Sequence, residues 1–446
     1  MAQPRFSHDL GTLKAIAADA LAHAAAKGAS ACEAEASDGY GQTVTVRKGE
    51  VETIEYNRDK SLGVTVYVGK RKGYASTADF TGRAVRDTVE AALTIARFTA
   101  EDEAAGLPDP EDLARNPGDL DLFHPWNPPV EEAIAMAKAC EAAAFRLDKR
   151  VVNSEGASVS AQQWQFALGN SHGFMEGFPT SRHTLSCAVI AAENGQMQRD
   201  DWHVSQRSVS DLARPEAVGD YAGRRALARL RSRKIGTLQA PVLFEAPVAN
   251  DFVSTFVAAA SGGNLYRKAS FLVDALGKTV FSPAVTLLER PHLPRGQASS
   301  WYDDEGVATR DRDVVRDGVL RGYFLGSYSA RKLGMKTTGS AGGNHNLILQ
   351  GGELDLPGLI RRMGRGLLVT ELIGFGVNLV TGDYSRGAAG FWVEGGEIRH
   401  PVEEITIAGN LRDMFRSIAA IGSDALTRGS RTTGSILIEE MTIAGN

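Results

Sequence analysis

The sequence predicts an α+β protein with an N-terminal α/β domain, a middle α/β segment and a β-rich C-terminal domain. Its 446 residues are too many for one ordinary core, because single domains run to roughly 100–200 residues. Helical spacing of apolar residues alternates with strand-like segments in the first half. After residue 236, short apolar runs separated by glycine-rich turns dominate. We expect domains at 1–115, 116–235 and 236–446.

The N-terminal domain is predicted from two helices and a hairpin. Apolar residues recur every three or four positions from about Asp9 to Lys27, and Gly28 ends this helix. The dipeptide Lys48-Gly49 separates two segments of alternating apolar and polar residues, a pattern typical of a hairpin. A second helix is expected from about Gly82 to Phe98, since its apolar residues lie on one face.

The middle domain follows an acidic, proline-rich linker at 101–129. Helical spacing continues over 133–147 and places Cys140 on the apolar face, which indicates a core residue rather than a nucleophile. Short alternating strands are expected over 151–204, and a basic helix at about 222–231 ends the domain.

Two nearly identical segments mark the C-terminal domain: 404–410 (EITIAGN) and 440–446 (EMTIAGN). Two strand–turn units of one sheet would explain the repeat. Chance duplication of a common strand ending is the alternative.

Composition limits the classes of function. A net charge of −5 argues against electrostatic binding to nucleic acid, which needs a concentrated positive surface. One basic cluster stands out, and we interpret it as a solvated helix face or as interdomain salt bridges rather than a phosphate-binding patch. The cluster contains Arg224, Arg225, Arg229, Arg231, Arg233 and Lys234.

The proportions of hydrophobic residues (43%) and charged residues (23%) are those of a soluble globular protein. The sequence has no run of about 18 apolar residues, and its N-terminus lacks the layout of a signal peptide. Three widely spaced cysteines suggest neither a disulfide framework nor a zinc ribbon. We therefore expect a cytoplasmic protein with reduced thiols.

We find no phosphate loop and no catalytic zinc motif in the sequence. Gly277-Lys278-Thr279 lacks the first glycine of a phosphate loop. None of the nine histidines falls in a His-Glu-x-x-His spacing, and the glycines around His172 and Glu176 disfavour a helical metal pair there. We assign no catalytic residue and no metal ligand.

Four motifs in the last third of the chain closely resemble the TldD/PmbA family of peptidases. They are Trp301–Gly306 (WYDDEG), Tyr328–Gly334 (YSARKLG), Thr338–His345 (TGSAGGNH) and Thr381–Trp392 (TGDYSRGAAGFW). The resemblance extends over essentially the whole chain, and implies an α+β fold of the TldD/PmbA type. The family has two kinds of subunit, and only one carries a zinc motif.

The zinc-bearing TldD subunit has a His-Glu-x-x-x-His motif where its C-terminal domain begins. At the similar position this chain has Glu245, Ala246 and Asn250, so no zinc role can be carried over. The rest resembles the PmbA subunit, also called TldE, through Ala260–Lys268 and Phe271–Gly277.

This resemblance implies a heterodimer in which the TldD-type partner holds zinc and cuts unfolded peptides. The present chain would be non-catalytic, would need no cofactor, and would help to enclose the peptides. The family is linked to peptide maturation and antitoxin degradation, and older names call it a modulator of DNA gyrase. A homodimer is also possible when the partner is absent, because a surface that pairs with a similar fold can pair with itself.

Candidate peptide-binding residues lie in the glycine-rich motifs, where paired glycines leave backbone amides free to bind an extended peptide. The alternative is structural: Asp303, Asp304 and Asp383 would cap turns, Arg386 would pair with one of them, and His345 would be a hydrogen-bonded histidine. The candidates are Gly262, Gly263, Tyr266, Arg267, Asp303, Glu305, Gly342, Gly343, His345, Asp383 and Arg386.

Two other functions compete with the subunit hypothesis. One is a stand-alone hydrolase in which His345 works with Asp383 or Glu305. The other is a protein that modulates DNA gyrase by binding it, without proteolysis. The three hypotheses predict different results. The subunit hypothesis predicts activity only with a partner, the stand-alone hydrolase predicts activity alone, and the gyrase modulator predicts partner binding without cleavage.

Overall fold

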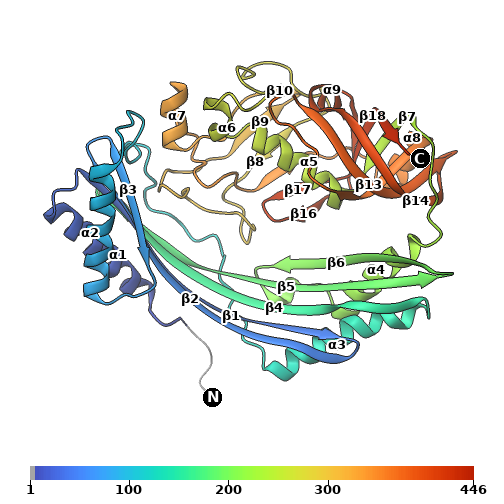
Figure 1. The fold of residues 1–446 in the computed structure, drawn as a ribbon, viewed down its shortest axis with the longest axis horizontal. Coiled ribbons are helices and arrows are strands. Elements are labelled where there is room, and N and C mark those ends of the chain that lie inside the picture. Colours follow the sequence, from blue (N-terminus) through green and yellow to red (C-terminus); the bar gives the residue numbers. More distant parts are fainter. Residues whose placement is uncertain (1–5, 446) are drawn as a thin grey trace. The chain divides into compact units, whose positions relative to one another are not determined.

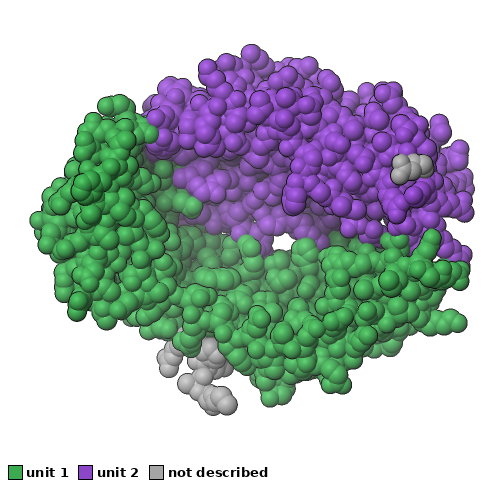
Figure 2. Space-filling view, viewed as in Figure 1, with its two compact units in different colours: residues 1–227, 302–308 green, residues 228–301, 309–446 purple. Residues whose placement is uncertain are grey.

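The computed structural model describes residues 6–445. The chain forms two compact units, which Figure 2 shows in different colours. Unit 1 contains residues 1–227 together with 302–308, and unit 2 contains 228–301 and 309–446. The short segment 302–308 lies in the C-terminal half of the sequence but belongs to unit 1 in the structure.

Unit 1 is built on one six-stranded antiparallel sheet in the order β3-β2-β1-β4-β5-β6 (Figure 1). Strands from both of the first two expected domains share this sheet. They are β1 (Ala31–Arg47), β2 (Glu50–Val68), β3 (Arg71–Thr77), β4 (Val151–Asn170), β5 (Met175–Glu193) and β6 (Gln196–Gln206).

Helices cover one face of this sheet. In β1 the even-numbered residues from Cys32 to Val46 are all buried, whereas Glu33 and Glu35 belong to the opposite face. This alternation follows from the two-residue period of a strand. The helices are α1 (Leu10–Ala26), α2 (Gly82–Phe98), α3 (Val130–Leu147), the short 3₁₀ turn η1 (Val209–Asp211) and α4 (Pro215–Ala228).

The structure confirms the first three predicted helices and the hairpin, whose turn residues Lys48 and Gly49 both have positive φ. The prediction for the basic helix was wrong at its start, because α4 begins at Pro215. Two glycines, Gly219 and Gly223, weaken the helical signal of its first half. Gly219 is needed there because a Cβ at this position would lie 1.8 Å from the carbonyl oxygen of Cys140 on α3.

Unit 2 contains two six-stranded sheets (Figure 1), with the orders β10-β9-β8-β11-β17-β16 and β14-β13-β12-β7-β18-β15. The strands are β7 (Leu238–Phe244), β8 (Leu287–Glu289), β9 (Arg312–Arg316), β10 (Val319–Leu320), β11 (Leu347–Leu349), β12 (Arg365–Ile373), β13 (Asp383–Glu394), β14 (Glu397–Asn410), β15 (Ile418–Ile421), β16 (Leu426–Arg428), β17 (Arg431–Thr433) and β18 (Ile436–Ala444). The helices are α5 (Ala246–Ala259), α6 (Gly262–Tyr266), α7 (Ser327–Leu333), α8 (Leu356–Met363) and α9 (Leu411–Arg416).

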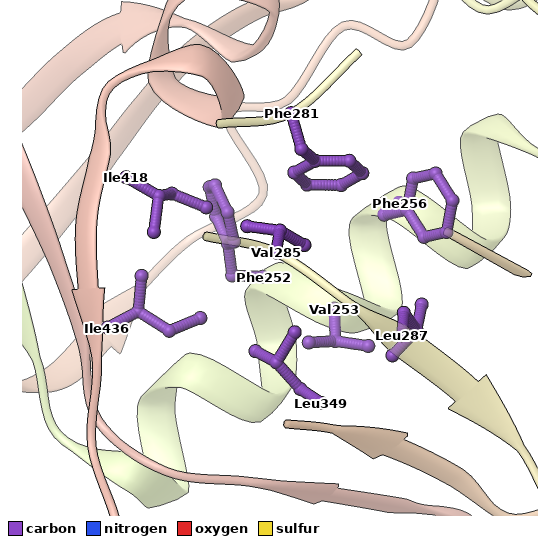
Figure 3. A pocket seen from close by; sticks show the side chains of 9 residues that line it. All are labelled: Phe252, Val253, Phe256, Phe281, Val285, Leu287, Leu349, Ile418 and Ile436. Carbon is purple, nitrogen blue, oxygen red and sulfur yellow. The ribbon is translucent and has the colours of Figure 1, made fainter. Parts of the chain in front are cut away.

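The core of unit 2 forms around α5 and an aromatic cluster. The ring of Phe415 stacks on Phe281 at 4.3 Å and meets the edge of Phe252 at 5.0 Å. Figure 3 shows an apolar pocket beside α5, lined by Phe252, Phe256 and other hydrophobic side chains. With no polar group in its lining, this pocket belongs to the core and offers no chemistry.

The sequence repeat corresponds to two strands of one sheet. Strands β14 and β18 pair directly and antiparallel, with Thr406 opposite Ala444 and Ala408 opposite Thr442. This confirms the interpretation that both segments are strand units of the same sheet. Asn446, the last residue of the second copy, lies outside the described residues.

Four residues of the basic cluster form ion pairs. Arg224 pairs with Asp220 and Arg225 with Asp200 in unit 1. In unit 2, Arg229 pairs with Glu371 and Lys234 with Glu404. These four residues form salt bridges, but each pair lies within one compact unit, so the pairs do not confirm the interdomain part of the interpretation.

The three cysteines are free and buried, and Cys140 lies in the core as predicted. Among the helices described for residues 6–445, none is both long and apolar enough to cross a membrane.

Candidate functional site

The start of α5 contains Ala246 and Asn250 and is the part of unit 2 at the position where the family resemblance places the zinc motif of TldD-type subunits. Glu245 ends the connection from β7 and is the N-cap residue of α5. The backbone N–H of Ala246 donates to Ser435 Oγ over 3.0 Å, and that hydroxyl donates to Asp424 Oδ2 over 2.6 Å. The start of the helix is thus held by hydrogen bonds to other parts of unit 2.

Asn250 lies one turn further along α5 and is buried. Its amide nitrogen donates to the backbone carbonyl of Arg431 over 3.1 Å, which joins α5 to the first residue of β17. A buried amide side chain needs such a partner. At this position the side chain therefore has a structural contact.

Arg386 on β13 forms an ion pair with Asp251 on α5, with 2.5 Å between Nη1 and Oδ2. The arginine side chain is 11% exposed and the aspartate side chain 47%. The alternative that Arg386 pairs with one of the turn aspartates was wrong, because its partner is Asp251. Only the fold brings these residues together, since 135 positions separate them in the sequence.

Asp383 closes the turn that leads into β13. It accepts hydrogen bonds from Thr381 Oγ1 at 2.6 Å and from Asn410 Nδ2 at 3.2 Å. These contacts match the turn-capping alternative.

His345 is enclosed by backbone groups of unit 2. Its Nδ1 lies 3.3 Å from the carbonyl oxygen of Ala298, and its Nε2 lies 3.0 Å from that of Gly339. Its own N–H donates to Glu289 Oε1 over 2.7 Å. His345 and Asp383 thus have separate partners, and the geometry does not form the acid–base pair that a stand-alone hydrolase would need.

Gly342 and Gly343 have φ angles of +84° and +124°, which residues with a Cβ adopt rarely. Their loop reaches β17, because Asn344 Nδ2 donates to Ser430 Oγ over 2.9 Å. The predicted loop residues therefore lie close to Arg431 in the fold.

The α6 region holds four further candidates. The N–H of Gly262 donates to the carbonyl of Phe324 over 2.8 Å, and a Cβ there would lie 2.2 Å from Ser329 Oγ. Gly263 follows it in the first turn of α6. The rings of Tyr266 and Tyr328 meet edge to face at 5.7 Å.

The exposed guanidinium of Arg267 lies 5.3 Å from the centre of the Tyr266 ring. These two side chains are the aromatic and cationic groups that α6 contributes to the predicted site.

The candidates Asp303 and Glu305 belong to unit 1, whereas the other nine belong to unit 2. Their segment 302–308 bonds to residues 112–114, and the ring of Tyr302 meets that of Phe174 at 5.0 Å. Asp303 accepts from the backbone N–H groups of Glu305 and Val307, each at 3.0 Å. This carboxylate therefore caps its own turn.

Sequence reasoning missed a carboxyl group on the face of β1 opposite the helices. The pKa of Glu33 is raised to about 8, first by desolvation and then by the charges of Glu305, Glu35 and Asp303, while Lys72 opposes the rise. The signal was present as two glutamates at positions 33 and 35, which a strand places on one face. The sequence did not show that the segment 302–308 would add more carboxylates near Glu33.

Sequence reasoning also missed Asp251 and Arg431. Neither belongs to a recognised motif, and only the contact of α5 with β17 brings them near each other.

Family models match the chain in three consecutive parts. Residues 32–96 match the PmbA/TldA metallopeptidase domain 1, residues 123–230 the central domain, and residues 237–445 the C-terminal domain. The chain belongs to the TldD/PmbA family. The motifs and the mixed helix and strand fold are those of this family.

Within the family, the chain is similar to proteins named PmbA. It is 50% identical to the metalloprotease PmbA of Escherichia coli O157:H7 over 91% of this chain and 90% of that protein. It is 44% identical to the PmbA homolog of Haemophilus influenzae, over 95% and 94%. The TldD homolog of Haemophilus influenzae is 23% identical, over 84% and 81%.

Solved structures of the family share the fold. A Bacteroides thetaiotaomicron protein, named for a proposed role as a modulator of DNA gyrase, has a TM-score of 0.92 and 27% identity, covering 97% of this chain and 99% of that one. TldE from Thermococcus kodakarensis has a TM-score of 0.80 and 20% identity, covering 96% and 100%. The second likeness concerns the fold alone.

The family is named for a metallopeptidase, but the residues of this chain do not fit a zinc site. Catalytic zinc takes about three ligands from His, Cys and carboxylates. Ala246 and Asn250 supply no such ligand, and the amide of Asn250 already binds the backbone of Arg431. Within residues 6–445, no group of three or more His, Cys, Asp and Glu side chains converges to hold a metal ion.

Proposed function

We propose that this chain is the PmbA (TldE) type subunit of a cytoplasmic TldD/TldE zinc metalloprotease. It is itself non-catalytic, and helps to enclose and bind unfolded peptides that a TldD-type partner cuts with its zinc. The observation that carries the proposal is the start of α5, where Ala246 and Asn250 stand in place of the general base and a zinc ligand of the TldD-type motif. The higher identity to PmbA than to the TldD homolog supports it.

The role of this chain would be to hold peptide in an extended form. The aromatic pair Tyr266–Tyr328 offers ring faces, which bind peptides of many sequences. The N–H of Gly343 already donates to the carbonyl of Ser340 over 3.1 Å, so this amide is not part of the proposed contact. Sequence-tolerant binding suits a protease that takes unfolded substrates. Peptide maturation and antitoxin degradation are the processes we propose for the complex.

A second candidate is a protein that modulates DNA gyrase by binding it. Two structural relatives, from Bacteroides thetaiotaomicron and Thermotoga maritima, carry names that refer to such a role, at 27% and 25% identity. The net charge of −5 favours a protein contact over a DNA contact for this candidate.

The deciding experiment measures cleavage of an unfolded, fluorescein-labelled casein by the purified chain, by a TldD-type partner and by their mixture. Zinc content is measured in the same three samples. We expect cleavage only in the mixture, with zinc following the partner. A mixture whose partner lacks its motif glutamate is the control and should be inactive.

Cleavage by this chain alone would refute the non-catalytic role. Binding to gyrase with no effect on cleavage by the partner would favour the second candidate. Light scattering of the isolated chain tests whether it forms a homodimer, as we propose for the subunit without its partner.

A further inference from the structure

Arg431 presents a guanidinium group that the fold only partly satisfies. Its Nε is buried and has no hydrogen-bond partner within residues 6–445. Burial lowers the pKa of Arg431, and the negative charge of Asp251 opposes this shift. Burying a charged group without a partner is unfavourable. A ligand that supplies hydrogen-bond acceptors would remove this penalty.

A second arginine lies beside the same aspartate. Arg386 donates from Nη1 to Asp251, but its Nε is also buried without a partner among the described residues. Arg386 forms an ion pair with Asp251, and the charge of the same carboxylate also acts on Arg431. These three side chains together carry one positive charge in excess. Asp251 is about half exposed, which leaves the cluster open to solvent from the side of α5.

Rigid contacts hold both arginines in place. The side chain of Asn250 fixes the backbone carbonyl of Arg431, and the loop of Gly342 and Gly343 is tied to the preceding residue, Ser430. Arg386 lies within the paired part of β13, opposite Ile407 of β14. Preorganised donors of this kind bind an anion with little loss of conformational freedom.

We infer that Arg386 and Arg431, near Asp251, form a subsite for a carboxylate group of a bound peptide. A guanidinium group binds a carboxylate through two parallel N–H donors, which suits this ligand better than a single point charge would. The inference rests on the proposed function, because it takes the ligand to be a peptide. The carboxylate comes from the C-terminus of the peptide or from an Asp or Glu side chain.

The test compares three fluorescein-labelled hexapeptides made of Ala, Gly and Ser, using fluorescence anisotropy with the full chain. One has a free C-terminal carboxylate, one is amidated, and one is amidated with a central Glu. Hydrogen bonds to charged groups contribute about 1.5–3 kcal/mol, so a carboxylate should improve affinity about tenfold to a hundredfold over the neutral amide. Tighter binding of the first or of the third peptide supports the inference and identifies the source of the carboxylate.

Substitutions then locate the effect. Arg431→Gln and Arg386→Gln should each reduce the preference for the carboxylate about tenfold, while binding of the neutral amide stays unchanged. The matched control is Arg316→Gln, which removes an arginine paired with Asp313 on β9 and should leave the preference intact. Arg431→Lys keeps the charge without the two-donor geometry, and should lose part of the preference.

The outcomes separate this inference from the proposed function. Equal affinity for all three peptides would overturn the carboxylate subsite and leave peptide binding standing. No binding of any peptide would overturn both. The comparison of peptides on the native chain decides the question even if a variant fails to fold.

Discussion

The pH dependence of stability should reveal the partly buried carboxyl group of Glu33. Its folded pKa is about 8, raised from an ordinary value of 4.5, chiefly by desolvation and then by Glu305. The perturbation is Glu33→Gln, which keeps the shape of the side chain and removes its ionisation.

The direction in which stability changes with pH depends on whether the folded or the unfolded chain holds the proton of Glu33 more tightly. Below pH 4.5 the group is protonated in both states, so it has no effect on stability. Between 4.5 and about 8 the unfolded chain releases the proton while the folded chain retains it, so stability falls as pH rises. Above pH 8 the penalty is constant.

The magnitude follows from the size of the pKa change. At about 1.4 kcal/mol for each pH unit, the rise corresponds to at most about 5 kcal/mol. The side chain of Glu33 is only partly buried, so we expect about 2–4 kcal/mol. Glu33→Gln should therefore stabilise unit 1 by this amount near pH 8.5 and by less than about 1 kcal/mol near pH 5.

The assay is urea unfolding of the full chain at both pH values, followed by tryptophan fluorescence. Glu55→Gln on β2 is the matched control, since it removes an exposed carboxylate on the same sheet. It should change the two midpoints equally. If Glu33→Gln behaves like this control, the group is not desolvated and the reasoning fails.

Three further substitutions test the packing. Gly219→Ala should destabilise by about 1–3 kcal/mol, because its Cβ would lie 1.8 Å from a carbonyl oxygen of α3. The control Gly236→Ala should not destabilise, since open space surrounds that position. Equal melting temperatures of the two variants would refute the close contact. Asn250→Ala should destabilise by about 0.5–1.5 kcal/mol by removing the hydrogen bond from this buried amide to the carbonyl of Arg431, and an unchanged urea midpoint would contradict this. Phe415→Ala should destabilise unit 2 by about 3–5 kcal/mol in the same assay, unless the aromatic cluster repacks.

Local sequence patterns determined the helices and strands in which buried residues recur at a regular spacing. The helices at Leu10–Ala26 and Gly82–Phe98 and the hairpin at Lys48 were visible because one face of each element is apolar at a regular spacing. Motifs of the last third determined the family, and the absence of histidine from α5 determined that the zinc motif is missing.

Only the tertiary structure decided which residues meet. Asp251 and Arg386 are 135 positions apart, and their ion pair depends on α5 packing near β13. The segment 302–308 joins unit 1, so Asp303 and Glu305 belong to a different unit from the other candidates. Periodicity reports which face of an element is buried, but it does not report which distant element covers that face.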